Sequence, residues 1–176
     1  MSRILQSADE LVDALIESVG KDIVLGLPIG IGKAVHVADA LFDRAAADES
    51  VSLTIFTGLT LETPHGRNEL ERRFLEPLVE RLYRRWPTPA YARAIRENTL
   101  PPNVRVHEFY LRPGAYLANP LVQQEYASIN YSQVVTELLR LGVNVIAQLV
   151  AVRSDRPGRY SLSSNPEITL DLLPQL

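Results

Sequence analysis

Hydrophobic and polar residues alternate along the chain with two periods, one typical of helices and one of strands. After Ser7, whose spacing from Glu10 is that of a capping box, apolar residues recur every three or four positions until Gly20. The short apolar run of residues 23–27 then has the composition of a buried strand. We therefore expect the chain to open with a helix followed by a strand.

A glycine-rich turn follows this strand and leads into a second helix, expected over residues 34–45, and a second strand, expected over 51–56. Strand, turn, helix and strand together make a βαβ unit, which favours parallel strand pairing. The pattern predicts an α/β fold with an open, mostly parallel sheet and helices on both faces, in a single domain over residues 1–176.

The remaining sequence continues this alternation. We expect helices that begin at Asn68, Ala90 and Ser132, the first reaching Trp86 with a kink or break at Pro77. Expected strands cover residues 104–110, 126–131, 143–152 and 160–162, with a loop at 112–120 and a turn at 155–158. Asn165 followed by Pro166 is typical of a helix start. Because that helix would be cut short at Leu176, we expect the natural polypeptide to continue.

Composition narrows the class of protein. The 176 residues (19.6 kDa) are enough for one hydrophobic core, and the absence of cysteine excludes disulfide scaffolds and thiolate metal sites. The net charge is -3 and there is no basic tail, so we expect no nucleic-acid partner. No apolar stretch is long enough for a membrane span or a signal peptide, which predicts a cytoplasmic protein without a membrane partner.

The strongest local motif is the glycine-rich segment of residues 26–33. It is not a P-loop, because Leu27 stands at the first glycine position and Ala34 at the hydroxyl position. A dinucleotide fingerprint would need a third glycine where Val35 stands. The motif fits an anion or oxyanion cradle of backbone amides, and it fits equally a tight turn without a ligand. The candidate binding residues here are Gly30, Ile31, Gly32 and Lys33.

A second candidate is the polar aromatic segment that precedes the helix at Ser132. If a strand ends there, Asn130 and Tyr131 face the crevice in which open α/β sheets bind ligands. The alternative is that both side chains satisfy nearby backbone groups, and the sequence does not separate the two interpretations.

Other polar residues favour ordinary structural roles. The three histidines, His36, His65 and His107, have no ligand spacing, so we expect no metal. No Gly-x-Ser-x-Gly elbow is present, and the serines at 161, 163 and 164 lie in a polar turn. Arginines at 72, 73, 81, 84 and 85 alternate with glutamates at 69, 71, 76 and 80, which is typical of a solvated helix face.

Four stretches together resemble the N-terminal domain of the acetyl-CoA hydrolase/transferase family, within the class I CoA-transferase group. They are residues 7–10, 24–33, 128–132 and 143–148 with 160–164. The resemblance implies a three-layer α/β fold and a chemistry in which a glutamate attacks an acyl-CoA thioester and a carboxylic acid or water accepts the acyl group.

The resemblance also implies that the nucleophilic glutamate lies in a second half of the enzyme, so we expect no catalytic residue in this chain. Its partners would be a missing C-terminal half or a separate catalytic subunit, with coenzyme A as a substrate, a carboxylate, and no tightly bound cofactor. Self-association of the chain stays open. Two alternatives remain: a stand-alone module that binds a small anion, and a domain similar to sugar-phosphate isomerases.

Overall fold

The computed structural model describes residues 3–84, 86–156, 158–162, 165 and 167–176. Five residues within features interpreted above lie outside the described residues: Arg85, Pro157, Ser163, Ser164 and Pro166.

The centre of the molecule is a parallel four-stranded sheet in the order β3-β2-β1-β4. Its strands are β1 (Asp22–Gly26), β2 (Ser52–Thr57), β3 (Val104–Glu108) and β4 (Val145–Ile146). In the register, Leu25 pairs with Ile55 on one side and with Val145 on the other. A parallel sheet needs both faces covered, since crossover helices connect its strands.

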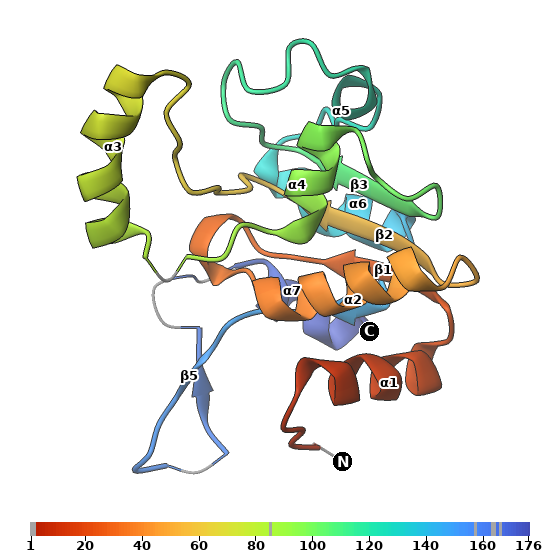
Figure 1. The fold of residues 1–176 in the computed structure, drawn as a ribbon. Helices are drawn as coiled ribbons and strands as arrows, with labels where there is room; N and C mark the ends of the chain where they lie inside the picture. The colour runs from red at the N-terminus through yellow and green to blue at the C-terminus, as the bar shows by residue number, and fades with distance from the viewer. Residues whose placement is uncertain (1–2, 85, 157, 163–164, 166) are drawn as a thin grey trace.

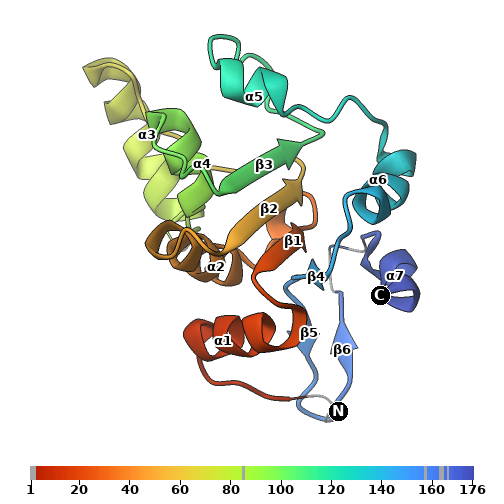
Figure 2. The same ribbon diagram turned by 90° about the vertical axis from the view of Figure 1, so that its right-hand side faces the viewer.

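Helices cover both faces of the sheet and make three layers (Figures 1 and 2). On one face lie α1 (Ala8–Val19), α2 (Val35–Ala47) and α4 (Ala90–Glu97), and on the other lie α6 (Val134–Arg140) and α7 (Thr169–Leu172). Short elements complete the chain: η1 (Gly30–Gly32), α5 (Pro120–Gln124), η2 (Tyr131–Gln133), η3 (Leu173–Gln175) and the antiparallel hairpin of β5 (Ala151–Val152) and β6 (Tyr160–Ser161). The predicted α/β class, with an open parallel sheet between helices, is confirmed.

Each sheet face has its own hydrophobic cluster because side chains alternate along a strand. Ile23 and Leu25 of β1 are buried against α1 and α2, whereas Val24 between them belongs to the cluster under α6. Phe56 of β2 lies in that second cluster and stacks on Phe109, with ring centroids 5.8 Å apart. Both faces are therefore packed.

The helix α3 (Glu69–Leu82) stands apart from the sheet, as Figure 1 shows. Its predicted cap is confirmed, because the Glu71 amide donates to Asn68 Oδ1 at 2.9 Å. The predicted end at Trp86 is wrong, since the helix ends at Leu82, and Pro77 does not split it. No described residue of α3 is buried, so water can solvate the carbonyl that proline leaves without a donor. The expected solvated face is confirmed, with Arg72 paired to Glu69 at 2.8 Å.

The structure corrects two predictions in the second half of the chain and adds a helix that was not expected. The strand expected at 126–131 is a single bridge between Glu108 and Tyr126. The run expected as one strand over 143–152 is divided between β4 and β5, because its middle leaves the sheet to follow the glycine turn, where the Leu149 amide donates to Gly32 O at 2.9 Å. The α5 helix was not predicted at all.

Helix starts differ from expectation at three places. In α1, Ser7 Oγ accepts from the Glu10 amide at 3.2 Å, but the Glu10 carboxylate bonds the Gln6 amide in place of the Ser7 amide. Ser132 lies inside η2, which begins after Asn130, so it does not cap α6. The last helix, α7, is preceded by Ile168, so the prediction that Asn165 caps it is wrong.

Candidate functional site

Polar side chains gather where the parallel strands end. Gly26 ends β1, Thr57 ends β2 and Glu108 ends β3, and all three lie at the carboxyl edge of the sheet. This edge is where open α/β sheets bind ligands. The glycine turn of η1 continues directly from β1 and leads into α2.

Lys33 is the most deeply buried charged residue of this edge, with only 1% of its surface exposed. Its ammonium donates to Pro28 O at 2.8 Å and to Gly58 O at 2.5 Å. These carbonyls belong to the turns after β1 and β2, so Lys33 fastens the two turns together. Burial lowers the pKa of Lys33 to about 8, and the negative charges of Glu108 and Glu167 oppose that shift.

Glu108 supplies the buried negative charge opposite. Its Oε1 accepts from the Thr60 amide at 2.6 Å, and 7% of the residue is exposed. Burial raises the pKa of Glu108, whereas the bond from Thr60 and the charge of Lys33 act to lower it. The two buried charges therefore compensate each other partly through space, and each of them also bonds to backbone groups.

A tyrosine anchors the turn after β2 to the helical layer. Tyr91 of α4 is 1% exposed, and its hydroxyl lies 3.1 Å from Thr60 Oγ1. Burial raises the pKa of Tyr91, so this hydroxyl stays protonated. Thr60 thus connects Glu108 on one side with α4 on the other.

The variant Tyr91→Phe is expected to lower the free energy of unfolding by about 1 kcal/mol, the usual net contribution of an intramolecular hydrogen bond, because the partner Thr60 is only partly buried. Urea denaturation followed by circular dichroism measures the change. Tyr110→Phe is the matched control, because Tyr110 is 51% exposed, and it should leave stability unaltered. Equal stability of Tyr91→Phe and the parent would show that the Thr60 contact contributes nothing.

The C-terminal segment lies directly over the glycine turn. Gly30 has a φ of +63°, which favours glycine, and Gly32 is buried. A Cβ at Gly32 would come within 2.2 Å of Asn165 Nδ2, so the Asn165 side chain covers this glycine closely. A larger residue at position 32 fits only if the Asn165 side chain moves away.

Glu167 brings the two sequence-predicted candidates together. Its Oε1 accepts from the Ile29 amide at 3.3 Å, just before the glycine turn, and its Oε2 accepts from the Tyr131 hydroxyl at 2.7 Å. A carboxylate therefore lies between the turn and Tyr131 (the surrounding elements β1, α6 and α7 are seen in Figure 2). Desolvation and this carboxylate raise the pKa of Tyr131 to about 12, so Tyr131 remains a donor at neutral pH.

The other site residues predicted from the sequence, Ile31, Lys33 and Asn130, do not share one environment. Ile31 is 52% exposed at the tip of the turn, whereas Lys33 faces backbone carbonyls inside the protein. The Asn130 backbone amide donates to Gln133 Oε1 at 2.9 Å, and the Asn130 side chain takes the other half of this capping box by accepting from the Gln133 amide. Ligand binding by these residues stays a prediction.

Sequence patterns gave no sign of Glu108, Thr60 or Glu167. Glu108 alternates within a strand like any polar residue, and Glu167 follows a proline in a stretch expected as a helix start. The useful signal would have been that Glu108 ends a strand of a parallel sheet.

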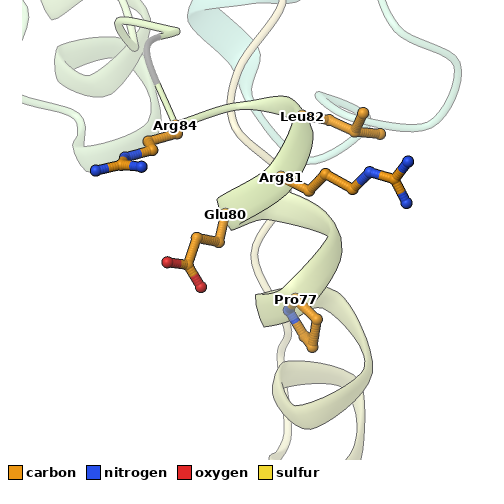
Figure 3. A pocket seen from close by; sticks show the side chains of 5 residues that line it. All are labelled: Pro77, Glu80, Arg81, Leu82 and Arg84. Carbon is orange, nitrogen blue, oxygen red and sulfur yellow. The ribbon is translucent and has the colours of Figure 1, made fainter.

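Two features outside this edge of the sheet offer no second group of converging polar side chains among the described residues. Among the described residues, no group of three or more His, Asp or Glu is arranged to hold a metal ion. A surface hollow at the end of α3 is lined by Pro77, Glu80, Arg81, Leu82 and Arg84. Figure 3 shows Glu80 and Arg84 pointing to one side of the helix and Arg81 and Leu82 to the other, so these side chains do not converge on a common point.

Comparisons with known proteins give no functional assignment for the chain. No family model, no curated protein and no solved structure matches the chain. Over its described residues, no helix has both the length and the apolar character needed to cross a bilayer.

Proposed function

We propose that this chain is the substrate-side half of a CoA-transferase or acyl-CoA hydrolase that acts on a short acyl-CoA and a carboxylic acid in the cytoplasm. The observation that carries the proposal is the carboxylate of Glu167 held between the Ile29 amide and the Tyr131 hydroxyl. Both stretches that contribute these donors belong to the resemblance, and a transferase must hold the carboxylate that accepts CoA.

The proposed chemistry requires a second half of the enzyme. A glutamate of that half attacks the thioester carbonyl, CoA leaves as a thiolate, and an acyl-glutamyl anhydride forms. The thiolate then attacks the glutamyl carbonyl and releases the first carboxylate. An acceptor carboxylate repeats the sequence in reverse, or water hydrolyses the intermediate. Backbone amides of residues 30–33 would stabilise the oxyanions that develop.

The stand-alone anion-binding module remains the second candidate, because the same observation supports it: the donors around Glu167 bind a carboxylate whether or not CoA is present. The two candidates differ in what accompanies the chain. A transferase half needs a glutamate-bearing partner, and a binding module does not.

The test is to purify the natural polypeptide from its source cells, measure its intact mass, and assay it with acetyl-CoA and a panel of short carboxylic acids. We expect a mass above 19.6 kDa or a copurifying subunit, with new acyl-CoA species or released acetate detected by mass spectrometry. The 176-residue chain alone should give no turnover. Turnover by that chain alone would contradict the proposal, as would an inactive natural assembly; sugar-phosphate binding would favour the isomerase-like alternative.

A further inference from the structure

The Glu167 carboxylate receives hydrogen bonds from separate parts of the chain. One donor is the amide of Ile29, which follows β1. The other is the hydroxyl of Tyr131, the first residue of η2, more than a hundred residues later. Asn165 Nδ2 adds a third, longer contact at 3.4 Å to Oε1. Lys33 attracts the same carboxylate through space without bonding it. The surroundings are complementary to one carboxylate group.

Side chains hold the segment that carries Glu167 in place. Gln148 Nε2 donates to Asn165 O at 2.9 Å, and Gln148 Oε1 accepts from the Thr169 hydroxyl. Gln148 therefore fastens the segment at both ends. Glu167 is only half-buried and Tyr131 is 45% exposed, in contrast to Lys33 and Glu108 nearby. Solvent reaches the edge of this carboxylate position.

We propose that the Ile29 amide and the Tyr131 hydroxyl form a binding position for a small carboxylate ligand, and that Glu167 occupies this position in the free chain. An external carboxylate binds when Glu167 moves out, so Glu167 is an internal competitor. The identity of the ligand as the CoA acceptor rests on the proposed function, whereas the competition follows from the contacts alone.

The number and kind of donors favour a carboxylate over a phosphate. Each oxygen of Glu167 receives a neutral donor, and Lys33, whose charge acts on this carboxylate through space, directs its described hydrogen bonds to two carbonyls. A doubly charged phosphate is recognised best by guanidinium groups, and none of the described contacts of Glu167 comes from an arginine. A singly charged group with two oxygens matches the position.

The test uses Glu167→Ala and sodium acetate. When an internal group occupies a site, the apparent dissociation constant rises by the inverse of the free fraction, so removing Glu167 should tighten acetate binding by about tenfold or more. Acetate is titrated against sodium chloride at matched ionic strength, and the Ile29 amide is followed by ¹H–¹⁵N correlation spectroscopy. In the variant, the Ile29 resonance should move toward its parent position as acetate saturates.

Three further variants make the outcome decisive. Tyr131→Phe added to Glu167→Ala should abolish most of the gain, and Glu17→Ala, which removes an exposed carboxylate of α1, should leave acetate binding as in the parent. Gln148→Ala loosens the segment without touching the donors, so it should also tighten acetate binding, and it serves if Glu167→Ala fails to fold.

Unaltered acetate affinity in Glu167→Ala or Gln148→Ala, or a gain that survives Tyr131→Phe, would overturn the inference. No acyl-CoA enters this experiment. Acetate binding without transferase activity in the natural protein would therefore sink the proposed function alone, and activity without competition by Glu167 would sink only the inference.

Discussion

Replacing Lys33 by Met is expected to lower the free energy of unfolding by about 2–4 kcal/mol, the range for a buried charge pair or hydrogen-bonded network that loses one member. Met keeps the length of the side chain but leaves Pro28 O and Gly58 O without their donor and Glu108 without its compensating charge. Relief from burying an ammonium opposes these losses. We expect the orphaned carbonyls to dominate, because two are buried at once.

The other lysine of the chain is a matched control. Lys21 has a half-exposed side chain and pairs with Asp48 at 3.0 Å on the surface. Exposed pairs contribute little, so Lys21→Met should leave urea denaturation nearly unchanged. Similar losses from the two substitutions would mean that the Lys33 contacts do not fasten the turns.

The pH dependence of stability in the parent and in Lys33→Met tests the burial of Lys33 separately. Its pKa is about 8 in the folded chain and near 10.5 when unfolded, so between these values the unfolded chain holds a proton that the folded chain lacks. Unfolding free energy then rises with pH. Above about pH 10 the tyrosines oppose the rise, because the pKa values of Tyr91, Tyr116 and Tyr131 are raised by folding.

Urea denaturation at pH 7.5 and 9.5 should therefore show parent stability increasing relative to Lys33→Met. A difference between the two proteins that stays constant over this window would show that Lys33 titrates as an exposed lysine does.

Gly32→Ala is expected to have the largest effect on function. The new Cβ would lie 2.2 Å from Asn165 Nδ2 and 2.6 Å from its Cγ, so the Asn165 side chain must move from its place over the glycine turn, and its contact with Glu167 is lost. Overpacking of this kind costs about 1–3 kcal/mol of stability. Under the proposed function, a displaced oxyanion cradle lowers turnover of the natural enzyme by about 10²–10³-fold, the cost of one lost donor.

The measurements are urea denaturation, the chemical shift of the Ile29 amide, and turnover of the natural assembly. Gly26→Ala is the control, because a Cβ there meets Leu138 at 3.4 Å, an ordinary contact. If Gly32→Ala keeps the Ile29 resonance and the activity of the parent, the close cover by Asn165 has no functional consequence.

Local patterns in the sequence predicted most of the helices and the strands of the sheet. The fold class follows from Ile23 to Leu27 and from Val51 to Phe56, because apolar strands joined by a helix must pair in parallel and be covered on both faces. Asn68 and Gly20 mark helix ends through contacts within one turn, and the structure confirms both. The errors at 126–131 and 143–152 arise from contacts between distant parts of the chain. Both runs have strand composition, but Tyr126 makes only one bridge to the sheet and Leu149 bonds to the glycine turn.

The glycine turn and Tyr131 were visible in the sequence as separate candidates, since a glycine-rich turn after a strand and a polar aromatic group before a helix are local signals. Their meeting on one carboxylate was decided only by the tertiary structure. Glu167 lies 138 residues from Ile29 and 36 from Tyr131, and no periodicity relates positions so far apart. The same holds for Lys33, whose ammonium finds Gly58 O only because β1 and β2 are adjacent in the sheet. Local sequence patterns indicated most of the helices and strands, and the packing of those elements determined which charges are buried and which groups they face.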